Sequence, residues 1–209
     1  LPNRWAWVLM ESAAPLGMAA WFVVGGRFDA VSITFLAIWQ AHYCQRAFVY
    51  PFLMKPGKHP MPLLIILFGL AFNLFNTYIN GRWLFSLSEP YPIAWLYDPR
   101  FIAGIVIFAI GYIINLHSDH VLRGLRGPGE TDFRIPRGGM FRYVSCANYL
   151  GELIEWIGWA VLTWSLPTTV FAAWTFANLA PRARATHRWY LKKFADYPKE
   201  RKALIPFLW

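Results

Sequence analysis

Ionisable and polar side chains that could take part in chemistry occur inside stretches of sequence that are otherwise apolar. Glu11 lies in the middle of the first such stretch, and Tyr43, Arg46 and Tyr50 follow in the second, spaced i, i+3 and i+7. In an α-helix this spacing places the three side chains on one face. Because charged groups are costly in hydrocarbon, they usually face a cavity or a partner. The pattern therefore predicts a functional site inside an apolar bundle.

A second group of polar residues lies near the ends of two later apolar stretches. Asn115 and Asp119 are one helical turn apart, and Asn148, Glu152 and Glu155 share one helical face. A structural alternative for Glu155 is a helix-end carboxylate paired with a loop arginine. As binding groups, amides and carboxylates offer the donors and acceptors that a polar ligand needs.

The segment of residues 123–143 is rich in Arg, Gly and Pro. Arginine supplies charge and paired donors suited to phosphate, and glycine lets the backbone approach a ligand closely. The segment contains neither GxxxxGK[ST] nor GxGxxG, so it supports neither a P-loop nor a Rossmann site. It fits a ligand with two phosphates held by this loop, the adjoining helix ends and the tail. A basic loop at a membrane surface is the alternative.

Two further patterns favour structural interpretations. Asn73, Asn76 and Asn80 form a stripe along one helix, which is typical of interhelical hydrogen bonding. The histidines and the two cysteines show no HxxxH, HExxH or CxxC spacing, so no metal site is expected.

The elements that carry these residues are predicted to be membrane helices. Of the 209 residues, 57% are hydrophobic and only 15% are charged, against about 25% in soluble domains. A bilayer core requires about 20 apolar residues per helix. We therefore expect an all-α integral membrane protein, residues 1–209 forming one domain with an Arg/Gly-rich loop and a basic C-terminal tail. The six candidate spans are residues 5–24, 30–53, 61–85, 101–121, 144–164 and 167–179.

The net charge of +9 is distributed unevenly between the two sides of such a bundle. With six spans, 17 of the 20 Lys and Arg residues fall on the side that holds the tail, and only Arg27, Arg82 and Arg100 fall on the other. The positive-inside rule makes the basic side cytoplasmic. The excess charge then faces anionic lipid and an anionic cofactor, and no nucleic-acid partner is expected.

Several longer strings of residues resemble the steroid 5α-reductase family, and the similarity extends over nearly the whole chain. The family has seven spans, which implies that one N-terminal span is absent from this sequence. The strings that carry the resemblance are residues 42–50 (HYCQRAFVY), 115–119 (NLHSD), 122–130 (LRGLRGPGE), 134–139 (RIPRGG), 148–158 (NYLGELIEWIG) and the tail from 196 to 207.

The resemblance implies a membrane-embedded, NADPH-dependent reductase of 3-oxo-Δ4 steroids. It implies that residues 1–100 hold the substrate and residues 101–209 the cofactor, and that Glu11 and Tyr43 contact the substrate ketone. In place of a tyrosine usual in the loop the chain has Phe133, and Thr186 occupies the position of a usual histidine, with His187 following. The implied cofactor contacts are Arg46, Tyr50, Asn115, Asp119, Arg126, Arg134, Asn148, Glu152, Trp156, Arg182, His187 and Tyr190.

Such a reaction has clear chemical requirements. Hydride transfer to an enone needs a polarised carbonyl, because negative charge develops on the ketone oxygen. Apolar surroundings favour the neutral acid, so Glu11 is expected to donate to the ketone from one side and Tyr43 from the other. Hydride then reaches C5 of the steroid. We expect a monomer that takes its steroid from the lipid and its NADPH from the cytoplasmic side.

Three alternatives remain open from the sequence. The chain could reduce another enone or enoyl lipid, such as a polyprenol precursor or an enoyl-CoA. It could instead be a membrane methyltransferase of the isoprenylcysteine type, in which S-adenosylmethionine replaces NADPH. A non-catalytic lipid-binding or transport bundle is the third, although the number of polar groups at one membrane end argues against it.

Overall fold

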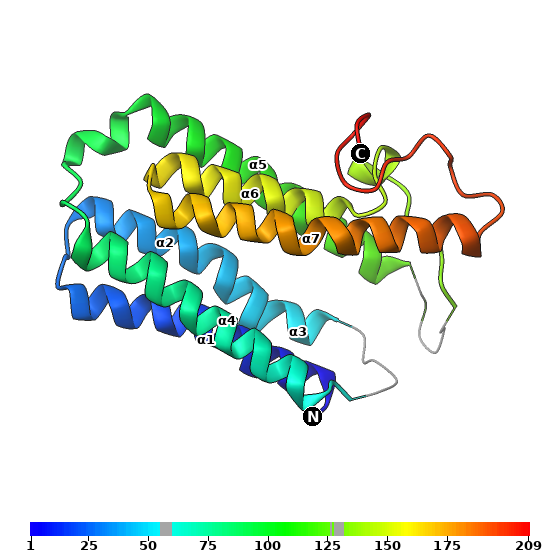
Figure 1. The fold of residues 1–209 in the computed structure, drawn as a ribbon, viewed down its shortest axis with the longest axis horizontal. Coiled ribbons are helices and arrows are strands. Elements are labelled where there is room, and N and C mark those ends of the chain that lie inside the picture. Colours follow the sequence, from blue (N-terminus) through cyan, green and yellow to red (C-terminus); the bar gives the residue numbers. More distant parts are fainter. Residues whose placement is uncertain (55–59, 126, 128–131) are drawn as a thin grey trace. The chain divides into compact units, whose positions relative to one another are not determined.

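A computed structural model describes residues 1–54, 60–125, 127 and 132–209. Their secondary structure is helical, apart from one isolated β-bridge between Val144 and Lys202. The chain divides into two compact units, unit 1 (Leu1–Asp98) and unit 2 (Pro99–Trp209). Figure 1 shows the helices of each unit running alongside one another.

Unit 1 is built on three long helical segments. They contain α1 (Asn3–Gly25), α2 (Ala30–Cys44) and α4 (Leu63–Arg82). Shorter elements extend them: the π-helical turn η1 (Gln45–Val49), α3 (Tyr50–Leu53), a second π-helical turn η2 (Trp83–Leu87) and the 3₁₀-helix η3 (Ile93–Tyr97).

Local chemistry explains how α1 ends and α2 begins. Gly26 adopts a left-handed conformation with φ of 67° and closes α1, a position that suits glycine. The Asp29 carboxylate accepts hydrogen bonds from the backbone N–H groups of Val31 and Ser32, both at 3.0 Å, and so caps α2. Burial works to raise the pKa of Asp29, but the bonds from Ser32 and Val31 outweigh it, so the net pKa is lowered.

The second predicted span, residues 30–53, is continuous but not regular. A π-helical turn, η1, separates α2 from α3. A π-helix has a wider turn than an α-helix, so the α-helical spacing used to place Tyr43, Arg46 and Tyr50 on one face does not hold across η1. This correction matters because single π-helical turns inside helices frequently occur at functional sites.

Unit 2 contains α5 (Pro99–Gly124), the 3₁₀-helix η4 (Gly139–Arg142), α6 (Ala147–Thr163) and α7 (Leu166–Lys193). The sixth helix was expected to be short and to end near residue 179. It instead continues through Pro181 to Lys193. An apolar cluster at the start of α6 accounts for part of this extension, because Ala180 and Ala183 of α7 pack into it.

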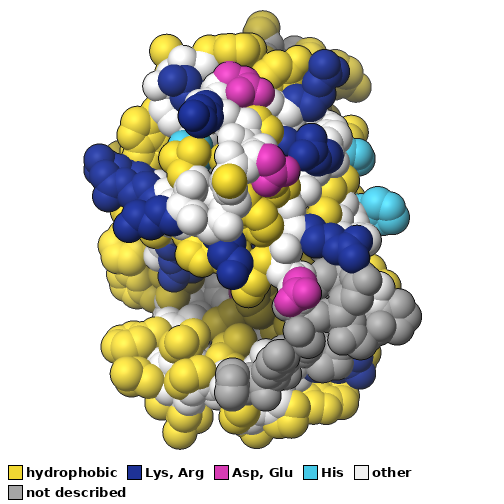
Figure 2. Space-filling view, turned by 90° about the vertical axis from the view of Figure 1, so that its right-hand side faces the viewer, with side chains coloured by type: hydrophobic (Ala, Val, Ile, Leu, Met, Phe, Trp, Pro, Cys, Tyr) yellow, Lys and Arg dark blue, Asp and Glu magenta, His cyan; other side chains and the backbone are white. Residues whose placement is uncertain are grey.

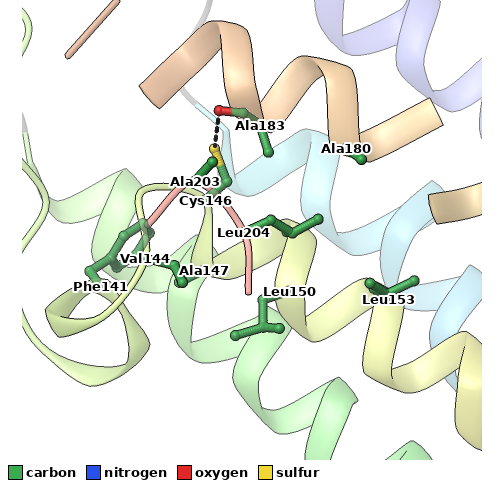
Figure 3. Packing of buried hydrophobic residues seen from close by; sticks show 10 residues of the cluster. All are labelled: Phe141, Val144, Cys146, Ala147, Leu150, Leu153, Ala180, Ala183, Ala203 and Leu204. Carbon is green, nitrogen blue, oxygen red and sulfur yellow. Dashed lines mark hydrogen bonds between the residues drawn. The ribbon is translucent and has the colours of Figure 1, made fainter. Parts of the chain in front are cut away.

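Figure 3 shows this cluster, in which α6, α7, the η4 region and the C-terminal tail meet. The Cys146 thiol lies 3.9 Å from the Ala183 carbonyl oxygen, and the side chain is only 3% exposed. Cys146 is therefore a packing residue rather than a reactive one. The tail is fixed by backbone bonds from the N–H groups of Ser145 and Cys146 to the carbonyls of Lys202 and Ala203.

Three helices of the described part of the chain are long and apolar enough to cross a membrane. They are Asn3–Gly25, Leu63–Leu87 and Pro99–Gly124. Together with the helical architecture, they support an all-α membrane protein, and the number of six spans stays a prediction. The division of function between residues 1–100 and 101–209 also stays a prediction.

Candidate functional site

Glu11 lies on α1 at a point where the helix backbone is perturbed. Pro15 is four residues later and has no N–H, so it cannot donate the usual intrahelical hydrogen bond to the Glu11 carbonyl. Two side chains of α2 donate to carbonyls close by. Trp39 Nε1 donates to Ala14 at 3.2 Å, and Gln40 Nε2 donates to Pro15 at 2.9 Å. These bonds fix α2 against the perturbed turn.

A second contact between the same segments shows that they run antiparallel. The Arg46 guanidinium lies 5.1 Å from the centroid of the Trp7 ring, whereas Trp39 meets Ala14 further along α1. The chain numbers therefore rise along α2 as they fall along α1.

This antiparallel pairing places the two predicted catalytic residues, Glu11 and Tyr43, at the same height along the helix axes. Tyr43 lies between Trp39 and Arg46 in the chain, and Glu11 lies between the two α1 residues that those side chains contact. Tyr43 is 5% exposed, and its ring centroid lies 4.7 Å from that of Trp39. The structure thus brings both predicted residues into one layer of unit 1.

Arg46 is held between two aromatic rings. Its guanidinium lies 4.5 Å from the Tyr50 ring centroid as well as 5.1 Å from that of Trp7. Such cation–π contacts fix the guanidinium orientation and contribute about 0.5–1 kcal/mol each at exposed sites. Trp7 was not anticipated from the sequence, and an aromatic residue one turn before Glu11 was the available signal.

The Asn73 side chain on α4 reaches the same layer. Its Nδ2 atom donates to the Met10 carbonyl at 2.9 Å and lies 3.4 Å from Glu11 Oε2. The sequence favoured interhelical bonding for this stripe, and Asn73 does make such a bond. Its additional approach to Glu11 was missed. The glycine one turn earlier, Gly69, was the sequence feature that could have indicated a close approach of α4 to α1. In the structure, a Cβ at Gly69 would collide with the Met10 side chain.

In unit 2, close packing of α5 on α6 gathers several predicted cofactor residues. Asn115 Nδ2 donates to the Asn148 carbonyl at 3.0 Å. A Cβ at Gly151 would lie 2.4 Å from the Asn115 backbone nitrogen, so only glycine permits this approach. Asp119 is 2% exposed one turn beyond Asn115, and Glu152 is half-buried one turn beyond Asn148. Predicted neighbours on two helices are therefore adjacent.

The described residues 133–136 of the Arg/Gly segment lie against α7 and the tail. The Phe133 ring lies 4.8 Å from that of Trp189, and Arg201 Nη1 donates to the Pro136 carbonyl at 3.0 Å. Arg134 in the same segment is exposed. Arg126, also predicted to bind the cofactor, lies outside the described residues.

A hydrogen-bonded network connects α7 to this region. Ser145 Oγ lies 2.6 Å from both His187 Nδ1 and Tyr197 Oη, and the Tyr190 ring stacks on that of Tyr197 at 5.1 Å. Burial, with a smaller contribution from the Lys202 charge, lowers the pKa of His187. Burial likewise raises the pKa of Tyr190 to about 12. Both side chains are therefore neutral at physiological pH, and they act as hydrogen-bonding groups.

Two other predicted cofactor residues of unit 2 lie in contrasting surroundings. Trp156 is 1% exposed, and its ring lies 4.7 Å from Phe171 and 6.2 Å from Phe108, so it contributes to the helix packing. Arg182 is exposed on α7. Figure 2 views the molecule from the end at which α7 terminates and shows Lys and Arg side chains spread over that face. The cofactor role of these residues stays a prediction.

The residues of unit 2 fit a dinucleotide phosphate chemically. Exposed arginines supply cationic donors, and the carboxylates of Asp119 and Glu152 can accept from sugar hydroxyls. Ser118 Oγ, near the end of α5, is buried and has no hydrogen-bond partner among the described residues, so a polar ligand atom there would satisfy it. Among the described residues, no group of three or more His, Cys, Asp and Glu side chains could hold a metal ion.

An apolar helical architecture with a half-buried carboxyl group between helices of unit 1, and a cluster of polar side chains in unit 2, is typical of a membrane-embedded enzyme. Comparison with known proteins agrees with this class. The family model described as 3-oxo-5-alpha-steroid 4-dehydrogenase matches residues 59–209.

Individual relatives match over the whole chain. The chain is 47% identical over 211 residues to 3-oxo-5-alpha-steroid 4-dehydrogenase 1 of Macaca fascicularis, covering 100% of this chain and 80% of that protein. It is 46% identical to the human enzyme of the same name, with 100% and 81% covered. It is 47% identical to human 3-oxo-5-alpha-steroid 4-dehydrogenase 2, with 100% and 82% covered. The chain therefore belongs to the 3-oxo-5-alpha-steroid 4-dehydrogenase family.

Membership of this family confirms the predicted resemblance and the enzyme class. The protein is an oxidoreductase acting on a CH–CH bond. This finding decides against the methyltransferase and against the non-catalytic bundle.

Proposed function

We propose that the protein reduces the Δ4 double bond of 3-oxo-Δ4 steroids to 5α-3-oxosteroids, with NADPH as hydride donor. The observation that carries this proposal is the layer in unit 1 where α2 and α4 both contact α1 around Glu11. Family membership supports a steroid rather than an enoyl-CoA or polyprenol-type substrate.

In the proposed reaction, the protein stabilises negative charge that develops on the 3-ketone oxygen. Glu11, as a neutral carboxylic acid, donates a hydrogen bond to that oxygen. Tyr43, which lies at the same level on α2, donates from its hydroxyl. When bound, NADPH would supply hydride to C5, and the resulting enolate would take up a proton from water at C4, which completes the reduction of the double bond. Tyr43 is buried and Glu11 is half-buried, so electrostatic stabilisation by both donors exceeds that in water.

The proposed cofactor site uses the polar cluster of unit 2. Arg46 and Tyr50 of unit 1 are assigned to the cofactor by family resemblance alone. The arginines Arg134 and Arg182 neutralise phosphate, and Arg126 is assigned to the same role by family resemblance alone. Asp119 and Glu152 accept from hydroxyls. The remaining members of the proposed set are Asn115, Asn148, Trp156, His187 and Tyr190.

We further propose that the basic loops and the C-terminal tail face the cytoplasm. The charge distribution supports this orientation. NADPH then enters from the cytoplasmic side, and the steroid enters from lipid. The enzyme acts as a monomer, with residues 1–100 holding the substrate and residues 101–209 the cofactor.

The test removes each proposed donor singly. In Glu11→Gln and Tyr43→Phe, kcat for a 3-oxo-Δ4 steroid should fall about 100- to 1,000-fold, as when one oxyanion donor is removed elsewhere. The dissociation constant of NADPH should change by less than about twofold, because neither group is assigned to the cofactor. Turnover is followed by NADPH oxidation and by product analysis.

Matched controls are available in the same unit. Glu89→Gln removes an exposed loop carboxylate, and Tyr78→Phe removes a hydroxyl from an exposed ring on α4. Both controls should keep wild-type turnover. Wild-type turnover in both Glu11→Gln and Tyr43→Phe would overturn the proposed catalytic pair.

A further inference from the structure

We propose that Asn73 is a positioning residue that orients the Glu11 carboxyl group for proton donation. This inference rests on the proposed role of Glu11 as the acid at the substrate ketone. The single Asn73 amide nitrogen donates to the Met10 carbonyl at 2.9 Å and lies 3.4 Å from Glu11 Oε2. Asn73 therefore links α4 to the α1 turn that contains Met10 and Glu11, through the Met10 backbone and the Glu11 carboxyl group.

The chemistry of the two contacts fixes the orientation of the amide. A carbonyl oxygen can only accept, so the nitrogen of Asn73 must face Met10, and its second N–H is directed away from that bond. In a neutral carboxylic acid, the carbonyl oxygen accepts a hydrogen bond more strongly than the hydroxyl oxygen does. When Glu11 is neutral, the approach of Asn73 to Oε2 therefore favours the tautomer that carries its proton on Oε1. Asn73 thus selects the oxygen that donates.

The position of Asn73 is held by packing on both sides. One turn earlier, Gly69 lies so close to Met10 that any Cβ would collide with the methionine side chain. One turn later, a Cβ on Gly17 of α1 would lie 2.5 Å from Thr77 Oγ1. Asn73 itself is 4% exposed. Because α4 is fixed at both flanking turns, the amide is presented to Glu11 in a defined place.

The other two asparagines of the stripe do not share this role. Asn80 Nδ2 donates to Asn76 Oδ1 at 2.8 Å and to the Asn76 carbonyl at 3.0 Å, so this pair is bonded within α4. Asn80 is 1% exposed and resembles Asn73 in burial and residue type. It provides a matched control for the structural cost of removing a buried asparagine from this helix.

The experiment is a double-mutant cycle on the full-length protein. We expect Asn73→Leu to lower kcat for the steroid about tenfold, and to change the NADPH dissociation constant less than twofold. If Asn73 acts through Glu11, the same substitution in Glu11→Gln should change the residual single-turnover rate less than twofold, because interacting residues are not additive. Asn80→Leu should lower thermal stability without this loss of kcat.

The outcomes separate this inference from the proposed function. Wild-type turnover in Glu11→Gln overturns the role of Glu11. Low turnover in Glu11→Gln, with the tenfold loss from Asn73→Leu undiminished in that background, overturns only the positioning role. Unchanged kcat in Asn73→Leu also overturns it. If Asn73→Leu does not fold, Asn73→Ala is measured in both backgrounds against the same criteria.

Discussion

The helices around the proposed cofactor cluster of unit 2 and those around the Glu11 layer of unit 1 pack in different ways, although both rely on glycine. In unit 2, a Cβ at Gly111 would lie 2.3 Å from the backbone nitrogen of Glu155, and Gly151 is equally close to the Asn115 backbone. Beside the Glu11 layer of unit 1, the Cβ positions of Gly69 and Gly17 would meet side chains of the neighbouring helix instead, although Gly25 at the far end of α1 would meet the Phe85 backbone. Backbone contacts cannot yield, whereas side chains can. The helix contacts of the proposed cofactor cluster therefore tolerate an added methyl group less well than those of the proposed substrate layer.

The largest loss of stability is expected when a Cβ is added where the backbones of α5 and α6 touch in unit 2. Gly111→Ala should lower the free energy of unfolding by about 3 kcal/mol, at the upper end of typical overpacking costs, because neither helix backbone can shift locally. NADPH affinity should fall with it. Gly124→Ala, at a glycine with nothing within 4 Å of the added Cβ, is the control and should stay within about 0.5 kcal/mol of wild type. Thermal unfolding in detergent measures both.

The corresponding substitution in unit 1 is Gly69→Ala. Its Cβ would meet the Met10 Sδ and Cγ atoms, and a methionine side chain can move. We expect a loss of about 1 kcal/mol, near the lower end of overpacking costs. A loss as large as that of Gly111→Ala would show that the two interfaces are equally rigid and would remove the contrast between the units.

Ser145→Ala tests a polar contact of unit 2 by removing one hydroxyl. That hydroxyl lies 2.6 Å from both His187 and Tyr197, so its loss leaves two partners without their bond. A cost of about 1 kcal/mol is expected, as for a typical intramolecular hydrogen bond. Ser12→Ala, whose hydroxyl is exposed and bonds within α1, is the control. Equal Tm values for both variants would contradict the network.

The thermal stability of the protein should depend on pH through the protonation of His187 in unit 2. Its pKa is lowered by burial and by Lys202, so the folded state binds fewer protons than the unfolded state near pH 6. Stability therefore rises with pH up to the unfolded-state pKa of about 6.5 and falls as the solution is acidified below it. The Tm measured from pH 7.5 to 5.5 should decrease, and less so in His187→Gln. Identical slopes would contradict this assignment.

The smallest effect is expected from the surface ion pair of unit 2. Arg137 Nη2 lies 3.9 Å from Asp196 Oδ2, and the two side chains are 69% and 74% exposed. Arg137→Ala should therefore change stability by less than about 0.5 kcal/mol, because solvent screens exposed pairs. A loss above 1 kcal/mol would show that this pair helps to hold the loop on the tail.

Much of the architecture could be predicted because it depends on local signals. Apolar stretches indicated the helices, and residues one turn apart, such as Asn115 and Asp119, do lie at one end of α5. The π-helical turn at Gln45–Val49 could not be predicted from α-helical periodicity. The extension of α7 through Pro181 depends on packing with the tail, which periodicity does not describe.

The candidate site could be predicted from the sequence only in part, because some of its contacts depend on packing between helices. Glu11 and Tyr43 were found as polar residues in apolar surroundings. The contact of Asn73 with Glu11 depends on how α4 rotates against α1, and sequence spacing within one helix gives no information on that rotation. The link from Ser145 to His187 likewise joins residues 42 positions apart.

Hydride transfer from NADPH to C5 of the steroid is tested most directly by isotopic labelling of the cofactor. The protein is supplied with NADPH carrying deuterium at both C4 positions of the nicotinamide and with a 3-oxo-Δ4 steroid. Mass spectrometry and NMR of the product should show one deuterium at C5 in the 5α configuration, and Glu11→Gln should form this product at least about 100-fold more slowly. A product without deuterium at C5, or no consumption of NADPH with any such steroid, would contradict the account.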